Sequence, residues 1–366
     1  MHPFRQIRSC LLRPDRPEKK MRESRNIKFR IAAALVLCLA SLAAGIGLGS
    51  VSVPLSYGWN IFLHETVGTS LSPDIDPILV SIFWSIRFPR TLTAFLVGGA
   101  LAASGAVMQS VLQNPLASSY TLGVSSGASV GAAVILVTGF SFPLIGAFTL
   151  PLVSFLFGLA TVFLAIGFSA KIDRNLKNQT IILVGMVLSL FVNAILTLIA
   201  AMAQENSHRL LLWEMGSFSS KNWYHVSVLF PVCLLGMLVL IRFSRVMDIM
   251  TFGDEQAMAI GVDTGKMKKF LIGVAAFLTG VSVCFTGVIG FIDLIAPHVV
   301  RRIFGSSHRI VLPMSFLTGG AFMALADLIS RTILSPEEIP VGAVTALIGA
   351  PFFAWVFFRG GRGKKR

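Results

Sequence analysis

Residues 91–170 read TLTAFLVGGALAASGAVMQSVLQNPLASSYTLGVSSGASVGAAVILVTGFSFPLIGAFTLPLVSFLFGLATVFLAIGFSA and contain no Asp, Glu, Lys or Arg. A helix that crosses a bilayer needs about 20 apolar residues, so this stretch predicts three or four crossings. Lipid offers no hydrogen-bond partner to the backbone, which leaves helices or a closed barrel, and these runs lack the alternation of barrel strands. The stretch therefore predicts an all-α, polytopic membrane protein.

The rest of the chain continues this pattern. Of 366 residues, 54% are hydrophobic and 13% are charged, too few polar groups to cover a water-soluble protein of this size. The apolar runs end at prolines, glycines and short basic clusters, which predicts about ten transmembrane helices. We place these spans at residues 30–50, 91–112, 121–140, 143–170, 179–203, 223–242, 269–289, 290–304, 310–330 and 341–358. The eighth is short for a full crossing.

Basic residues are distributed unevenly between the two sides of these spans. The net charge of +14 comes from short clusters between apolar runs, which is not the pattern of a nucleic-acid-binding module. Loops on the cytoplasmic side retain Lys and Arg. With the N-terminus inside, all but five of the 31 Lys and Arg lie on that side, so both termini are predicted to be cytoplasmic. The five left outside are Arg87, Arg90, Arg209, Lys221 and Arg331.

The predicted transmembrane domain, residues 30–358, lies between two basic tails at residues 1–29 and 359–366. A secretory signal would place its apolar segment near the start of the chain, and the first tail does not. We therefore expect both tails in the cytoplasm. Met21 is an alternative start.

An internal repeat divides this domain. Four residues recur 182 positions later, each matched with a residue of the same type: Gly98, Gly105, Pro115 and Gly123 with Gly280, Gly287, Pro297 and Gly305. The first copy begins in a span that runs inward and the second in one that runs outward. The repeat therefore predicts two inverted five-helix halves, at about residues 30–203 and 223–358, around a central path.

Glycines are concentrated within several predicted spans. Small residues in membranes let helix backbones approach each other closely. We expect most of these glycines to serve tight packing and a few to line a wide conduit. The set comprises Gly98, Gly99, Gly105, Gly273, Gly280, Gly287, Gly319 and Gly320.

Ionisable groups inside the predicted spans are few: Asp293, His298 and Asp327. Each costs ~3 kcal/mol or more in hydrocarbon, so each is expected to face protein or water. Asp327 lies one helical turn from Arg331, which predicts a local ion pair. Asp293 has no such neighbour and is a candidate for a transport path. An ion-coupled secondary transporter that uses Asp293 and Asp327 is therefore an alternative interpretation.

The sequence holds no recognisable nucleotide, metal or catalytic motif. Gly261–Met267 comes nearest to a phosphate loop, but three residues instead of four separate its glycines and no Ser or Thr follows Lys266. No cysteine pair has the spacing of a metal site. We therefore expect a chain that is not an enzyme and binds no metal or cofactor itself.

Several longer motifs lie in order along both halves. The first half contains Arg87-Phe88-Pro89-Arg90, residues 105–109, 114–117 and 122–128; the second contains residues 212–217, 287–291, Pro297-His298 with Arg301, Ala326-Asp327 with Arg331, residues 339–342 and 349–353. Together they resemble the iron-siderophore and vitamin B12 ABC importer permeases of the FecCD type. The resemblance covers residues 30–358 and implies ten helices in two inverted halves.

The resemblance also implies a function and partners. It implies a permease in the bacterial cytoplasmic (inner) membrane that takes up an iron-siderophore, or a related metal chelate such as haem or cobalamin. A second permease copy in a homodimer, or a paralogue, would complete the pore. Two ATP-binding cassette subunits would bind ATP and Mg, and an external substrate-binding protein would deliver the cargo.

Docking and coupling residues follow from the same resemblance. Arg87, Arg90 and Arg331 match outward arginines that receive glutamates of the binding protein, and guanidinium forks suit carboxylates. Residues 251–262 are similar to a coupling helix that inserts into the ATPase. Its implied contacts are Gly253, Asp254, Glu255, Ala257, Gly261 and Val262.

The transport path is less clearly marked. Asn178, Gln179 and Thr180 match the family's narrow cytoplasmic exit, and Asp293 joins them as a path candidate. Asp293, Glu214 and Ser118-Ser119 depart from the family's usual residues. These departures leave the cargo open without touching the predicted architecture.

Overall fold

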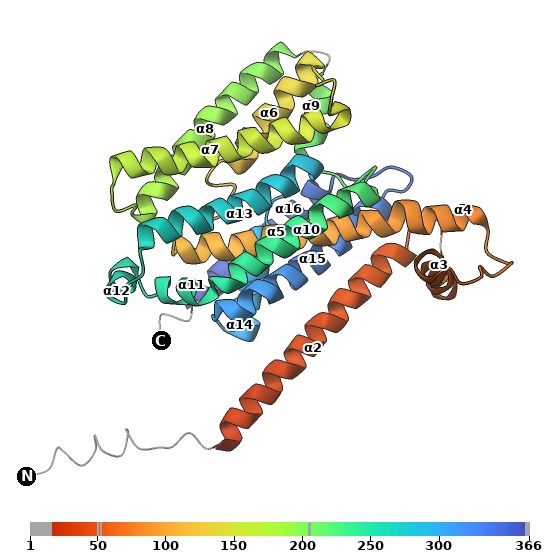
Figure 1. Ribbon diagram of the computed structural model, residues 1–366, viewed down its shortest axis with the longest axis horizontal. Coiled ribbons are helices and arrows are strands. Elements are labelled where there is room, and N and C mark those ends of the chain that lie inside the picture. The colour runs from red at the N-terminus through yellow and green to blue at the C-terminus, as the bar shows by residue number, and fades with distance from the viewer. Residues whose placement is uncertain (1–16, 50, 52, 204–205, 363–366) are drawn as a thin grey trace, which may run out of the picture.

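The computed structural model describes residues 17–49, 51, 53–203 and 206–362, and within these ranges every regular element is a helix (Figure 1). Most of the predicted N-terminal tail and the last four residues lie outside the described residues. The described part of each predicted tail continues a neighbouring helix. The predicted all-α fold is confirmed.

Among the described residues, the first half contains six longer helices and three short elements. They are α2 (Pro17–Gly47), α3 (Leu55–Val67), α4 (Pro77–Val80), η1 (Ser81–Arg87), α5 (Phe88–Val111), α6 (Val124–Thr138), η2 (Gly146–Phe148), α7 (Thr149–Ile172) and α8 (Asn178–Met202). The second half contains α9 (Ser207–Glu214), α10 (Trp223–Arg242), α11 (Ser244–Met250), α12 (Asp254–Ala259), α13 (Thr264–Thr286), α14 (Ile292–Phe304), α15 (His308–Thr332) and α16 (Val341–Arg362).

Within the residues that the structure describes, each of the ten predicted spans contains one α-helix: α2, α5, α6, α7, α8, α10, α13, α14, α15 and α16. In the described part of the chain, seven helices are long and apolar enough to cross a membrane, and α6 and α16 are shorter apolar helices. The 13-residue α14 corresponds to the short eighth span. Most of the long helices run along the bundle, whereas α2 leaves it at an angle; α3 and α4 lie at one end and α11 and α12 at the other (Figure 1). We name these the α3 end and the α12 end.

One predicted boundary is wrong. The first predicted span, residues 30–50, agrees with the candidate span Ile27–Gly47, which belongs to a helix that begins earlier, at Pro17. The second span begins at Pro77 rather than residue 91, because α4, η1 and α5 run on as one segment of 35 residues. Asp76 caps the start of this segment, because its side chain accepts a hydrogen bond from the Ile78 N–H at 2.8 Å. The π-helical turn of η1 lies directly before Pro89, whose ring has no N–H to donate.

The core is organised around α5, which is buried along nearly its whole length and packs against α2, α10, α13, α14 and α15. A Cβ on Gly98 would meet the carbonyl oxygen of Gly319 on α15, and a Cβ on Gly105 would meet the carbonyl oxygen of Asp293 on α14. The prediction that these glycines permit close helix packing is therefore confirmed.

The two halves pack in matching pairs. α5 packs on α14 and α15, while α13 packs on α6 and α7, so the long second helix of each half lies against the other half. The residue matches proposed for the repeat are wrong in part. Gly105 lies inside α5 whereas Gly287 ends α13, and Pro115 lies in a turn whereas Pro297 lies within α14. The 182-residue offset aligns α5 with α13 but not the helices that follow.

Candidate functional site

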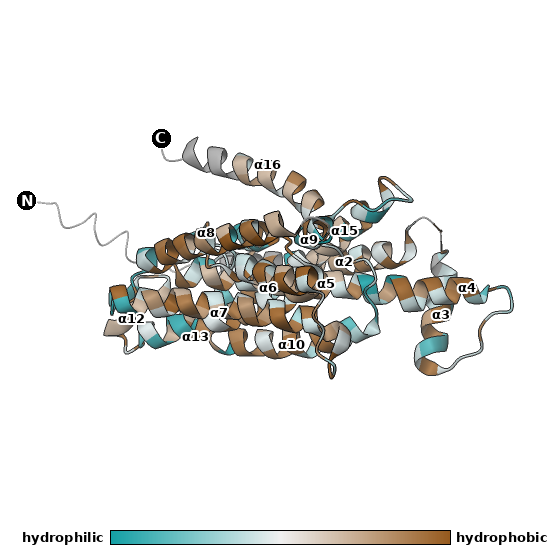
Figure 2. Ribbon diagram, turned by 90° about the horizontal axis from the view of Figure 1, so that it is seen from above, coloured by the Kyte–Doolittle hydropathy of each residue, from teal (hydrophilic) through white to brown (hydrophobic). Residues whose placement is uncertain are grey.

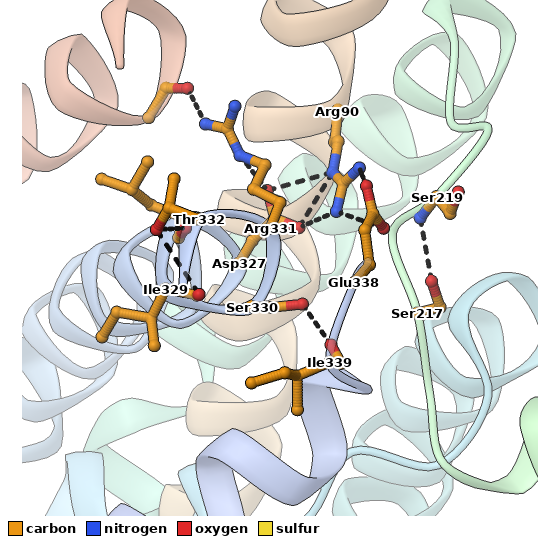
Figure 3. A network of polar contacts seen from close by, with 12 residues as sticks. Arg90, Ser217, Ser219, Asp327, Ile329, Ser330, Arg331, Thr332, Glu338 and Ile339 are labelled. Carbon is orange, nitrogen blue, oxygen red and sulfur yellow. Dashed lines mark hydrogen bonds and ion pairs between the residues drawn. The ribbon is translucent and has the colours of Figure 1, made fainter. Parts of the chain in front are cut away.

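Three arginines gather at the α3 end, and we call Arg87, Arg90 and Arg331 the arginine cluster. Arg87 ends η1, Arg90 lies in the first turn of α5 and Arg331 in the last turn of α15. Arg90 donates to Asp327 through Nη2 at 2.8 Å and Nε at 3.0 Å, and to Glu338 through Nη1 at 2.6 Å (Figure 3). Two carboxylates therefore bind adjacent edges of one guanidinium and share its Nη2 as a donor.

The other two arginines hold the end of α2. Arg87 donates to the carbonyl oxygens of Gly47 at 3.2 Å and Val51 at 2.5 Å, and Arg331 donates to that of Gly45. The last carbonyls of a helix lack intrahelical partners and carry partial negative charge, so cations bind well there.

The arginine cluster lies beneath the surface. Arg87 and Arg90 are only 5% and 7% exposed. The local ion pair predicted between Asp327 and Arg331 is present at 3.5 Å. The closer partner of Asp327 is Arg90. It could not be predicted from sequence spacing, because 237 residues separate Arg90 from Asp327. The docking role implied for the three arginines stays a prediction.

At the α12 end, residues 251–262 form a short helix that is held firmly against the bundle. Gly253 (φ 114°) and Gly261 (φ 92°) adopt left-handed backbone conformations that favour glycine, so α12 starts and stops sharply. Asp254 accepts a hydrogen bond from Lys268 Nζ at 2.5 Å, and the same ammonium donates to the Leu176 carbonyl at 2.9 Å. Since Lys268 is fully buried, α12 is fixed both to α13 and to the loop before α8.

The residues that the resemblance implies for coupling fall into two groups: most of them shape the segment, and one is exposed on its surface. Ala257 is buried and its carbonyl accepts the Val262 N–H at 3.0 Å, so these two shape the segment together with Gly253, Asp254 and Gly261. Glu255 is exposed. The large apolar side chains that face outward are Phe252, Met258 and Ile260, at 77%, 53% and 70% exposure. Sequence reasoning did not single them out, because apolar residues carry little signal in so apolar a chain.

The predicted gate residues do not meet Asp293. Asn178, Gln179 and Thr180 form the first turn of α8, beside the α12 end. Asp293 lies in the first turn of α14 and lines a cavity further along the bundle. Ser189 on α8 lines that same cavity, and it lies about 16 Å along the helix from Asn178 at 1.5 Å per residue.

This cavity, of about 530 Å³, is formed by the residues before α6 and by α6, α8, α9 and the start of α14. Its polar lining comprises Ser118, Tyr120, Ser125, Ser126, Ser129, Ser189, Asn193, Glu214 and Asp293. Burial raises the pKa of Glu214 from its usual value, and a hydrogen bond from Ser129 partly opposes the rise. Three of the residues that depart from the family pattern, Ser118, Glu214 and Asp293, thus meet in one cavity.

A polar network, also missed by sequence reasoning, joins α11 to this cavity. Asp248 on α11 accepts from His308 Nδ1 at 2.6 Å, and His308 Nε2 contacts Ser110 Oγ at 2.5 Å. Arg301 donates to Ser110 Oγ at 3.0 Å and to Gln109. Gln109 in turn donates to the Asp293 carbonyl at 3.2 Å. The network ties α5, α11, α14 and α15 together between α12 and the cavity.

A membrane bundle of two matching halves, with a polar cavity and a rigidly held helix at one end, defines a transport permease. The chain belongs to the FecCD transport family, whose family model matches residues 35–359. The resemblance noted from the motifs is thereby confirmed, and the protein is an ABC transporter permease.

Known proteins of this kind match most of the chain. The ABC transporter permease protein YvrB of Bacillus subtilis is 42% identical over 88% of this chain and 91% of its own. The cobalamin import system permease protein BtuC of Halobacterium salinarum is 36% identical over 88% and 86%, respectively. A solved structure described as an inward-facing conformation of an ABC transporter of metal-chelate type has a TM-score of 0.79 and 30% identity, covering 91% of this chain and 99% of that one.

Proposed function

We propose that this protein is the permease subunit of a binding-protein-dependent ABC importer for an iron-siderophore or a related metal chelate. Two copies, or one copy and a paralogue, form the pore in the cytoplasmic membrane of a bacterium. Two ATP-binding cassette subunits bind the α12 end from the cytoplasm, where both termini lie. An external substrate-binding protein docks on the α3 end.

The observation that carries this proposal is the exposed apolar surface of the coupling segment. Phe252, Met258 and Ile260 are exposed on a short segment that lies outside the candidate membrane spans. Apolar side chains grouped outside the bilayer indicate a protein partner. Because the Lys268–Asp254 ion pair anchors α12 to α13, a push on this surface would be transmitted directly into the bundle.

Changing this surface should uncouple transport. In the importer reconstituted with its ATPase, Met258→Glu together with Ile260→Glu is expected to lower ATP-driven uptake about 30-fold or more, as loss of an interface hot spot does. The control is Val67→Glu, an exposed apolar residue at the end of α3, at the opposite end of the bundle from α12. ATPase binding is the deciding measurement, because Val67 lies at the end where the binding protein is proposed to dock and a loss of uptake alone would not separate the two partners. Equal losses of ATPase binding in both variants would argue against α12 as the coupling surface.

The choice of cargo class is supported by the relatives. They include a cobalamin import permease and the hemin transport system permease protein HmuU of Yersinia pestis, which is 33% identical over 89% of this chain. A wide polar cavity with few charged groups suits a bulky chelate that is held weakly in passage. We infer that the external binding protein makes the first selection among chelates.

A second permease copy is supported by the position of α16. This helix projects from one face of the bundle and packs mainly against α14 and α15 (Figure 2). Leu347 on α16 is 75% exposed, and α8 presents Leu190 and Phe191 at 70% and 63%. A homodimer would cover these apolar faces and place the two polar cavities beside a shared path.

The geometry does not favour the alternative of an ion-coupled carrier that uses Asp293 and Asp327. Asp327 is fully buried between Arg90 and Arg331 and is not among the residues that line the cavity. A carboxylate held by two guanidiniums is a poor site for reversible ion binding, because releasing it would leave buried charges unpaired.

A further inference from the structure

The cavity between α6, α8, α9 and α14 contains two carboxylates that the permease architecture does not explain. Asp293 lies in the first turn of α14 and Glu214 is the last residue of α9. The cavity volume of about 530 Å³ is within the usual range of small-molecule sites. Among the described residues that line it, none is Lys, Arg or His.

Asp293 is held in place without a partner for its charge. The residue is 2% exposed, and its carboxylate is approached by the Ser118 hydroxyl and by the backbone N–H groups of Asp293 and Leu294, but by no cation among the described residues. Its main chain is fixed, since its carbonyl oxygen accepts from Gln109 at 3.2 Å and presses against Gly105 of α5. A buried carboxylate without a cation beside it is costly, so in natural proteins it calls for an explanation such as a charged ligand.

The backbone leading to Asp293 is also strained. Phe291, two residues earlier, has φ 71°, a conformation that bulky residues rarely adopt. Such strain persists where the surrounding structure enforces it, commonly at functional sites. Tyr120 lines the same wall, but its hydroxyl donates to the Ile289 carbonyl at 2.8 Å rather than to Asp293.

We propose that this cavity is a cargo-contacting site that selects metal chelates bearing a cationic group. The Asp293 and Glu214 carboxylates would receive an ammonium, and the serine hydroxyls and Asn193 would bind the neutral chelate body. Polyanionic chelates would be repelled, because no basic group of the lining offsets the two carboxylates. This inference rests on the proposed import of metal chelates and narrows their chemical class.

The first test compares two probes of nearly equal size. The complete importer is reconstituted in vesicles and offered a ferric trihydroxamate with a terminal ammonium, or the same chelate with that amine acetylated. We expect Asp293→Asn and Glu214→Gln each to lower the uptake ratio of the ammonium chelate to the acetylated chelate about tenfold. Glu65→Gln, which removes an exposed carboxylate on α3 outside the cavity, should leave the ratio unchanged.

The second test needs no transport. A hydrophobic carbodiimide is expected to label Asp293 in the purified protein, as located by mass spectrometry. The gallium form of the ammonium chelate should protect Asp293 at least fivefold better than its acetylated counterpart, by analogy with loss of a partly screened charge pair. Equal protection by both chelates, or by neither, would overturn the cationic site.

The two tests separate this inference from the function on which it rests. An unchanged uptake ratio in both cavity variants, with ATP-driven uptake intact, refutes the cationic site and keeps the importer. Selective protection of Asp293 without ATP-driven uptake of either chelate keeps the site and argues against the importer.

Discussion

Asp327→Asn is expected to destabilise the protein far more than Glu338→Gln, although both acids bond Arg90. Asp327 is fully buried and neutralises Arg90 and Arg331 together, so losing its charge leaves Arg331 without a carboxylate and Arg90 with only the partly exposed Glu338, at a cost of ~3–5 kcal/mol. The Glu338 side chain is 36% exposed, so solvent screens its ion pair and the loss should be ~0–1 kcal/mol. Unfolding titrations in mixed micelles measure both. Equal losses would mean that the buried ion pairs contribute little.

The same Glu338 variant tests docking at the arginine cluster. If carboxylates of the binding protein compete with Glu338 for Arg90, then Glu338→Gln should strengthen docking by up to about fivefold, the range of one screened ion pair. Affinity of the purified binding protein for the permease in nanodiscs provides the measurement. Weaker docking by the variant would exclude Arg90 as a receptor and would instead favour Glu338 itself as a contact.

Gly98→Ala is expected to destabilise the bundle even though alanine is the better helix former. The added methyl would strike the Gly319 carbonyl and Met323 Cβ at the α5–α15 crossing, and backbone atoms cannot move aside cheaply. We expect a loss of ~1–3 kcal/mol or more, as for overpacked cores.

The matched control for this variant is Gly167→Ala on α7. No atom lies within 4 Å of the position that its methyl would occupy, so helix propensity should dominate and stability should rise by up to ~1 kcal/mol. Apparent melting temperatures of the two variants in one detergent compare them directly. A fall of similar size in both would show that α5 and α15 do not pack closely.

The sequence predicts the helices well because the bilayer imposes a length on each apolar run. Among the residues described, each of the ten spans contains one α-helix, and the short eighth span is the short α14. The prediction failed at residues 77–90, a mostly apolar run whose arginines, Arg87 and Arg90, favoured an outer loop. Asp76 and Pro77, just before this run, are a helix-start signal that marks the true beginning of the segment.

The sequence pattern could not predict contacts between side chains that lie far apart along the chain. The Asp327–Arg331 pair could be predicted from a spacing of one turn, but the stronger Arg90–Asp327 pair joins α5 to α15. The same is true of Lys268 with Asp254, and of His308 with Asp248 and Ser110. These partners are chosen by how helices pack in three dimensions, which periodicity within one helix does not encode.

Motif comparison identified individual residues of the cavity but could not show that they lie together. Glu214, Ser118 and Asp293 each stood out as departures from a familiar pattern, yet they lie on three separate segments of the chain. Only the fold shows that they line one space, whereas Asn178, Gln179 and Thr180 lie elsewhere on α8. The departures are therefore correlated in space, which is why we interpret them as one site.

The central claim is that energy for transport comes from a separate ATPase that grips the α12 end. The most direct measurement compares uptake of a labelled ferric chelate into vesicles that contain this protein alone with uptake into vesicles that also hold the ATPase and the binding protein. We predict uptake only in the second case, dependent on ATP and indifferent to ion gradients. Uptake by the protein alone, driven by a proton or sodium gradient, would contradict the account.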